Sequence, residues 1–222
     1  MNAQAPGLLN LTPLELLTTT RSVRKRLDFE RPLDPAVLRT CVAIALQAPS
    51  GSNRFPMQFV IVTDEGRRRA LADAYRIAYE GYRESPGYIG AIDKGDPEAN
   101  AQQQRTARSA DYLAEHFHRS PAIVLACGLG RADDGPPDRK TNLLGSIAPG
   151  MWSFMLAARL HGLGTCWTGL SLREERRTAD AVGIPIDEVT IAAVTPVAHT
   201  RGTDFRPALR PNPDDVIHWE VW

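Results

Sequence analysis

Residues 48–63 read APSGSNRFPMQFVIVT and place a loop directly before a β-strand. Residues 58–63 form an apolar run of the length of one strand, which we expect to be buried in a sheet. The loop before the strand contains Pro49, Ser50, Gly51 and Asn53. Glycine lets a ligand approach the backbone, and an asparagine carboxamide can both donate to and accept from a heteroaromatic edge. A ligand-binding loop is therefore one interpretation, and an ordinary turn is the other.

Helices are expected on both sides of this stretch. Asp34 followed by Pro35 is typical of a helix start, and the apolar spacing of residues 38–45 predicts a helix that ends before Pro49. Asp64 can cap another helix directly after the strand. Each helix has one apolar face, which predicts that it packs on one side only.

Two segments have the pattern of a helix capping box. Residues 12–15 read TPLE, in which Thr12 and Glu15 can each bond the backbone amide of the other. A short helix should therefore end just before Arg21. Residues 171–174 read SLRE and predict a second capped helix.

The rest of the chain supplies further strands and helices. Residues 122–127 and 189–197 are rich in apolar and β-branched side chains and predict strands, while residues 110–117 show helical spacing. Residues 151–160 are apolar nearly all round, which indicates either a core helix or a subunit interface. Residues 84–104 break every period, so we interpret them as a mobile excursion or lid.

The composition is that of an ordinary neutral globular chain. Lys and Arg together number 26, as do Asp and Glu, so no overall charge would attract nucleic acid or an anionic membrane. Without a repeat or linker, residues 1–222 are expected to form a single domain. No run approaches the roughly 18 apolar residues of a membrane span, and residues 1–20 lack the pattern of a signal peptide. We expect a cytoplasmic protein with no nucleic acid or membrane partner.

Side chains that bind metals or act as nucleophiles form no recognisable pattern. Cys41, Cys127 and Cys166 lie in mostly apolar surroundings, so reduced packing cysteines are expected, with Cys166 as the alternative of one reactive thiol. The five histidines show neither HExxH nor zinc spacing, and no GxSxG motif is present. We therefore expect no metal site and no serine hydrolase.

Residues 21–26 read RSVRKR and concentrate four cations after the first predicted helix. Arg21 and Arg24 are spaced so that both guanidiniums can hold one phosphate, and the Ser22 hydroxyl and nearby amides add donors. The alternative is a solvated basic helix end that interacts with its own dipole. A nucleic-acid site is a third interpretation, weakened because no aromatic side chains are interleaved with the cations.

Residues 162–169 read GLGTCWTG, with three glycines in eight residues. Such a backbone can lie against a flat ligand and present N–H groups to it. The stretch has neither the GxGxxG spacing of a dinucleotide site nor the GK[ST] ending of a phosphate-binding loop. A helix C-cap followed by a connector is the alternative interpretation.

These motifs and the C-terminal tail together resemble one known family. The segments 18–26 (TTTRSVRKR), 48–62, 162–169, 203–210 (TDFRPALR) and 216–219 (VIHW) resemble, in this order, the nitroreductase family of FMN-dependent oxidoreductases. The resemblance implies an α+β fold with a mostly antiparallel central sheet wrapped by helices. It also implies a homodimer in which the C-terminal tail crosses to the partner.

The resemblance also implies how the chain would hold FMN. Arg21, Ser22 and Arg24 would hold the phosphate and ribityl chain, or Arg24 would face the N1/C2=O edge of the flavin. The loop residues Pro49, Ser50, Gly51 and Asn53 would come from the other subunit, because the flavin of this family lies in the dimer interface. The isoalloxazine would lie along Cys166, Trp167, Thr168 and Gly169, with the Thr168 amide near N5. Arg206 and Arg210 would return from the tail to the phosphate.

The implied activity is hydride transfer from NADH or NADPH to nitroaromatic, quinone or related conjugated electrophiles by a ping-pong cycle. Because the flavin carries this chemistry, no catalytic side chain is expected. Other reactions on the same fold remain open, namely reductive dehalogenation, flavin fragmentation and deazaflavin-dependent reduction, as does a non-catalytic flavin-binding protein. Thr20 stands where the family commonly has an arginine, and Phe55 and Met57 stand where it usually has Gln and Trp.

Overall fold

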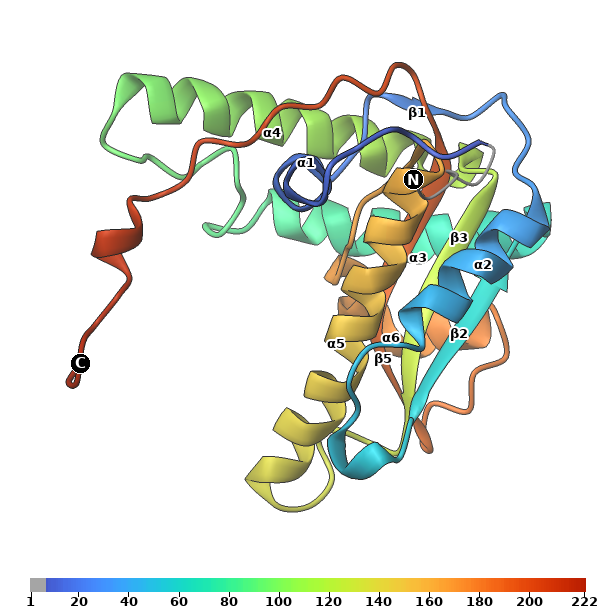
Figure 1. The fold of residues 1–222 in the computed structure, drawn as a ribbon. Helices are drawn as coiled ribbons and strands as arrows, with labels where there is room; N and C mark the ends of the chain where they lie inside the picture. Colours follow the sequence, from blue (N-terminus) through green and yellow to red (C-terminus); the bar gives the residue numbers. More distant parts are fainter. Residues whose placement is uncertain (1–6) are drawn as a thin grey trace, which may run out of the picture.

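The computed structural model describes residues 7–222 and shows an antiparallel sheet surrounded by helices (Figure 1). Residues 1–6, part of the segment for which no signal peptide is expected, lie outside the described residues. The sheet of the described chain has the strand order β1-β5-β3-β2, with β4 also paired to β5, and all pairings are antiparallel. The strands are β1 (Leu27–Asp28), β2 (Met57–Val62), β3 (Ala122–Leu129), β4 (Leu163–Thr165) and β5 (Val189–Thr200). The predicted α+β class with an antiparallel sheet is confirmed.

Several helices begin where the sequence predicts. The α-helices are α1 (Pro13–Thr19), α2 (Pro35–Ala45), α3 (Glu65–Arg83), α4 (Pro97–His116), α5 (Pro137–Leu160) and α6 (Glu175–Asp180). The Glu15 amide donates to Thr12 Oγ1 at 3.2 Å and the Thr12 amide donates to the Glu15 carboxylate at 2.8 Å, which is the predicted capping box. Asp34 and Asp64 cap α2 and α3 by accepting first-turn amides at 2.8 and 2.9 Å.

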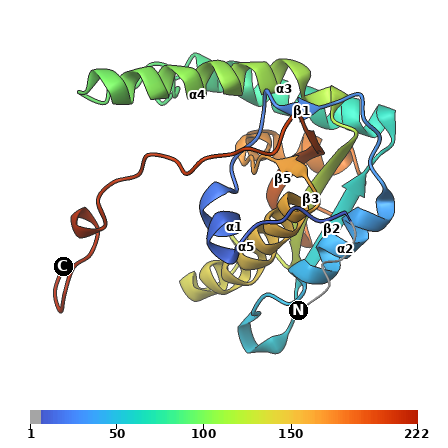
Figure 2. The ribbon, with the colours of Figure 1, turned by 45° about the horizontal axis from the view of Figure 1, so that its top comes forward.

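β3 is the central strand and separates two hydrophobic cores. Leu125 faces a cluster that includes Leu71 of α3. The next residue towards the N-terminus, Val124, faces the opposite cluster, which includes Leu38 of α2 and Phe154 of α5. Because side chains alternate along a strand, one buried strand supplies both cores. α2 and α5 therefore cover one face of the sheet and α3 covers the other (Figures 1 and 2).

The strand predicted at residues 58–63 is observed as β2, and its expected burial is only partly correct. β2 lies at the end of the strand order, so its outer edge is not paired within the described chain. Gln58 is exposed and the Ile61 side chain is 38% exposed, whereas Met57 and Val62 are buried. β2 is therefore a half-buried edge strand.

α5 is the core helix predicted from residues 151–160, and it begins earlier, at Pro137. Met151, Phe154 and Ala158 are buried, while Trp152 is 40% exposed. Among the described helices, α5 alone has the length and composition to cross a membrane, but 56% of its most apolar window is buried inside the fold. Packing against the sheet accounts for its apolar composition.

The expectation of irregular structure over residues 84–104 is wrong for its second part, residues 97–104, and holds for the turns before it. α4 begins at Pro97, where Asp96 caps it by accepting the Ala99 amide at 2.7 Å. Proline at the first helical position starts a helix because its missing N–H is not needed there. The turns before α4 are also fixed, since Gln104 Nε2 donates to the Gly90 carbonyl at 2.8 Å.

Near residue 170 one expectation is wrong and another is only partly correct. Residues 171–174 lie inside a 3-10 helix, Leu170–Glu174, and the Ser171 hydroxyl is buried without a hydrogen-bond partner, so no capping box forms. The glycine-rich stretch is only partly a connector. Gly162 ends α5 with a φ of +70°, as predicted for a C-cap, but Leu163–Thr165 then forms β4. Pairing with β5 and burial at this position override the low strand propensity of glycine.

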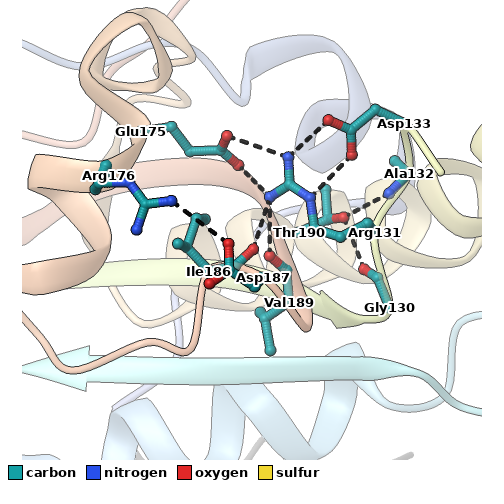
Figure 3. A network of polar contacts seen from close by, with 10 residues as sticks. All are labelled: Gly130, Arg131, Ala132, Asp133, Glu175, Arg176, Ile186, Asp187, Val189 and Thr190. Atoms are coloured by element: carbon teal, nitrogen blue, oxygen red, sulfur yellow. Dashed lines mark hydrogen bonds and ion pairs between the residues drawn. The ribbon is translucent and has the colours of Figure 1, made fainter.

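Arg131 joins the end of β3 to α6 and β5 (Figure 3). Its guanidinium makes two hydrogen bonds of 2.9 Å to Asp133 and one of 2.9 Å to Glu175. It also donates to the carbonyls of Ile186 and Val189 at 3.1 and 3.2 Å. The Arg131 side chain is only 16% exposed, so these partners replace most of its water.

We predict that Arg131→Ala lowers the free energy of unfolding by about 2–4 kcal/mol, because it leaves a half-buried carboxylate and two carbonyls without their donor. Arg176→Ala is the control. Arg176 pairs with Asp187 at 3.4 Å, but both side chains are at least 70% exposed, so its loss should change stability by less than about 0.5 kcal/mol. Urea unfolding of both variants measures the difference, and equal effects would contradict a structural role of Arg131.

Candidate functional site

A basic cavity of about 360 Å³ lies between the segment after α1, the helix α4 and the C-terminal tail. Arg21, Ser22 and Arg24, three of the predicted phosphate-binding residues, line one side of it. The tail residues Pro207, Ala208 and Leu209 and one face of α4 line the rest. The lining contains three arginines, the third from α4, and no carboxylate.

The charges around this cavity are not neutralised within the described chain. Arg21 Nη1 donates to the Arg206 carbonyl at 2.8 Å, and neither Arg21 nor Arg24 lies within 4.0 Å of a carboxylate of residues 7–222. Burial and the nearby positive charge of Arg210 lower the pKa of Arg21. The charge of Arg210 on the tail therefore acts on Arg21. Like charges gathered without a counter-ion favour an anionic ligand.

Arg26 and Arg159 hold the beginning of the tail by contacting Phe205 and its neighbours, a set of contacts that we call the Phe205 clasp. The Arg26 guanidinium lies 4.2 Å from the centre of the Phe205 ring and the Arg159 guanidinium lies 4.8 Å from it. Arg26 also bonds Asp204 at 2.6 Å, and the largely buried Arg159 donates to the Thr203 carbonyl at 2.8 Å. The clasp fixes the direction in which the chain leaves β5 towards the basic cavity.

Beyond the clasp the tail leaves the body of the molecule (Figures 1 and 2). Residues 209–222 are exposed, including Trp219 at 80%. Within this chain the tail is therefore not docked along its whole length, although its first part lines the cavity.

The segment after β4 passes close to the basic segment. The Val23 amide donates to the Thr165 carbonyl at 2.8 Å. Cys166 is almost fully buried, and burial raises the pKa of its thiol, which supports a packing cysteine and not a reactive thiol. Trp167 is half-buried and Gly169 is exposed, with no atom near the position that a Cβ would occupy.

The Thr168 amide, which the resemblance places near flavin N5, is already hydrogen-bonded within the chain. The Thr168 amide donates to the Val194 carbonyl at 3.0 Å, and the Val194 amide donates back to Thr168 at the same distance. This amide is therefore not free to face flavin N5. The Thr168 hydroxyl, in contrast, is buried and has no hydrogen-bond partner among residues 7–222.

The loop with Pro49, Ser50, Gly51 and Asn53 lies elsewhere in the chain. It borders a second cavity of about 740 Å³, formed with the first half of α5, and this cavity shares no lining residue with the basic cavity. The Gly51 amide donates to Ser146 Oγ of α5 at 3.0 Å, which fixes the loop against the helix. The structure thus does not bring this loop together with Arg21 and Arg24 in one chain.

The backbone of this loop is unusual. Ser52, Asn53 and Phe55 have φ angles of 51°, 55° and 49°, a left-handed conformation that residues with a Cβ rarely adopt. Strained backbone of this kind is concentrated at binding sites. These φ angles are compatible with a binding loop as well as with a turn.

Two contributions to these cavities were not found in the sequence. The first is the face of α4 that borders the basic cavity, which starts at the end of the segment 84–104 and continues to Ser109, before the helix expected at residues 110–117. Asp96-Pro97-Glu98 is a recognisable helix start and would have revealed the helix, but not that one of its faces borders a cavity. The second is Ser146, whose contact with Gly51 joins residues 95 positions apart and leaves no local signal.

Comparison with known proteins identifies the class of protein. A model of the nitroreductase family matches residues 17–199, so the chain belongs to the nitroreductase family. A protein of Archaeoglobus fulgidus, named provisionally as an NADH dehydrogenase/NAD(P)H nitroreductase, is 25% identical over 94% of this chain and 98% of its own length.

Solved structures have the same fold. A point variant of the FMN and NADPH-dependent nitroreductase NfnB from Sphigopyxis sp. strain HMH has a TM-score of 0.68 at 25% identity, covering 96% of this chain and 100% of its own. Iodotyrosine deiodinase bound to FMN and 3-iodo-L-tyrosine has a TM-score of 0.68 at 18% identity, covering 94% and 98% of the two chains. At that identity the second likeness shows the fold alone.

We predict that Phe205→Ala releases the start of the tail. Two cation–π contacts, each of about 0.5–1 kcal/mol, are lost, so amide hydrogen exchange over residues 201–206 should become about tenfold faster. Ile217→Ala, an exposed residue farther along the tail, is the control and should leave exchange at 201–206 unchanged. If Phe205→Ala also leaves it unchanged, the hydrogen bonds of Arg26 and Arg159 hold the tail without the ring.

Proposed function

We propose that the chain is an FMN-dependent oxidoreductase that transfers hydride from NADH or NADPH to nitroaromatic, quinone or related conjugated electrophiles by a ping-pong cycle. The observation that carries the proposal is the basic cavity, in which Arg21 and Arg24 of the first family motif face the tail without a neighbouring carboxylate. The names of the NfnB and Archaeoglobus relatives support FMN and NAD(P)H as the cofactor and the electron donor.

The residues of this cavity fit a phosphate monoester. Burial, and after it the charge of Arg210, lower the pKa of Arg21, and a phosphate dianion would offset both effects. The exposed Ser22 hydroxyl adds a donor, and Arg24 lies beside it. The Arg206 carbonyl accepts a hydrogen bond from Arg21, which keeps Arg206 beside the cavity.

The segment 166–169 is proposed to lie along the isoalloxazine. Because the Cys166 side chain is buried and the Thr168 amide is paired, the parts of this segment left for a ligand are the half-buried Trp167 and the open side of Gly169.

When bound, FMN supplies the redox chemistry by accepting a hydride from the nicotinamide and passing it to the acceptor. The side chains of this chain therefore need only bind and orient. The arginines neutralise the phosphate, and the Phe205 clasp directs Arg206 and Arg210 towards it. No residue is assigned to proton transfer.

We further propose that the functional unit is a homodimer with two such sites. Pro49, Ser50, Gly51 and Asn53 would reach the flavin of the partner, because within one chain their loop borders a separate cavity. Exposed apolar side chains offer the surface for association, namely Leu14 at 70%, Leu17 at 58%, Trp152 at 40% and Trp222 at 101%. The tail would cross to the partner, and each single-domain chain, residues 1–222, would be cytoplasmic with no nucleic acid or membrane partner.

The first test is flavin loading and turnover. The purified protein should take up about one FMN per chain, NADH or NADPH should bleach it anaerobically, and a nitroaromatic or quinone should restore the oxidised spectrum. Failure to take up added FMN would remove the family function. Bound FMN that NAD(P)H does not reduce would indicate a flavin-storage protein, and turnover only with halogenated aromatics would indicate reductive dehalogenation.

The second test asks whether one site uses two chains. Arg24→Ala should weaken FMN binding by roughly 30-fold to several thousand-fold, and Asn53→Ala by about tenfold. A mixed dimer contains one Arg24→Ala subunit and one Asn53→Ala subunit. If each site uses both chains, one site carries both substitutions and the other site carries neither. Tandem-tag purification of this mixed dimer should recover one tight FMN site per dimer. If both residues belonged to the same chain's site, the mixed dimer would have no tight site.

A further inference from the structure

The helix α4 presents a wholly polar face to the basic cavity. Gln102, Arg105, Thr106 and Ser109 all line it, and their spacing of three, four and seven residues places them on one side of a helix. The buried residues of α4, Ala107 and Leu113, lie at other positions of the helix. The side of α4 that faces the cavity therefore offers only hydrogen-bonding side chains, opposite the tail residues Pro207, Ala208 and Leu209.

Arg105 has no acidic partner in the described chain, unlike Arg69 and Arg76 of α3, and this is also true of its neighbour Arg108 on α4. In α3, Arg69 pairs with Glu65 at 2.6 Å and Arg76 pairs with Glu80 at 2.7 Å. Arg105 has no carboxylate within 4.0 Å among residues 7–222 and shares the cavity with two more arginines. Its charge thus adds to the local excess of positive charge in a chain of net charge zero.

The position of α4 is fixed independently of any ligand. Asp111 accepts a hydrogen bond of 2.9 Å from the Tyr79 hydroxyl and another of 2.9 Å from the Tyr88 hydroxyl. Gln104, the neighbour of Arg105, is bonded to Gly90 on the preceding turns. Because these contacts hold the helix on both sides of residue 105, Arg105 is presented to the cavity without a large ordering cost.

We propose that the polar face of α4 is a further wall of a phosphate-binding site and that Arg105 binds the phosphate group of FMN. This inference rests on the proposed function. Arg105 would form a charge-assisted hydrogen bond to a phosphate oxygen across the cavity from Arg21 and Arg24. Gln102, Thr106 and Ser109 would bond the remaining phosphate oxygens or the ribityl hydroxyls.

The test compares FMN and riboflavin titrations of Arg105→Ala with those of Arg108→Ala. Arg108 lies on the same helix, is exposed and does not line the cavity, so it controls for the loss of one positive charge from α4. Arg105→Ala should raise the FMN dissociation constant about 10- to 100-fold and the riboflavin constant less than about twofold. Arg108→Ala should change both less than about twofold, and Arg105→Lys should recover part of the FMN affinity.

An unchanged FMN constant in Arg105→Ala, or an equal loss for FMN and riboflavin, would overturn the inference. A wild type that binds no FMN would instead overturn the proposed function. Arg210→Ala, titrated with FMN and riboflavin in the same way, serves as the reference for a tail arginine at the same phosphate.

The nicotinamide donor also carries phosphate groups, so the KM of Arg105→Ala is measured with NADPH and with NADH. A raised KM for NADPH with unchanged FMN binding would assign Arg105 to the donor and overturn its assignment to FMN.

Discussion

Pairing at the C-terminal end of β5 holds the candidate site together. Leu27 of β1 pairs with Thr200 and Leu163 of β4 pairs with His199. The Arg201 amide donates to the Arg26 carbonyl at 2.8 Å. The basic segment precedes β1, the segment 166–169 follows β4, and the tail follows β5. Three parts of the sequence that are far apart therefore meet because they pair at the end of one buried strand.

The arginines of this chain fall into groups that differ in how their charge is balanced. Arg131 is surrounded by two carboxylates and two carbonyls and ties elements of the fold together. Arg159 is buried against Phe205 and gives its hydrogen bond to a backbone carbonyl. Arg21 and Arg24 face a cavity with no carboxylate. Because gathering unbalanced charge costs free energy, a bound anion would stabilise this arrangement, as the proposed FMN phosphate would.

Local signals were sufficient for much of the fold. The cap at Thr12 and Glu15 and the caps at Asp34 and Asp64 bond first-turn amides as predicted, because capping depends only on neighbouring residues. The predicted burial of β2 was partly wrong because the position of a strand in a sheet is a long-range property. The SLRE segment has the residues of a capping box, yet tertiary packing buries Ser171 in a 3-10 helix.

The site was predicted less completely for a similar reason. The sequence alone singled out Arg21, Ser22 and Arg24, because four cations within six residues are unusual in a chain of zero net charge. The contribution of α4 could not be singled out, since its polar face is recognisable as a cavity wall only when the helix lies across from these arginines. The pairing of the Thr168 amide with Val194 likewise joins residues that no local pattern connects.

The strained loop at residues 51–55 gives the two-chain site a physical rationale. Holding Ser52, Asn53 and Phe55 at positive φ costs roughly 1–3 kcal/mol for each residue, and the contact of Gly51 with Ser146 helps to maintain that conformation. Within one chain this loop borders a cavity separate from the basic one. In the proposed dimer the same loop would approach the partner's flavin in a conformation already formed on folding. Association would then complete the site without a further cost of ordering the loop, and bound cofactor would in turn stabilise the dimer over its separated chains.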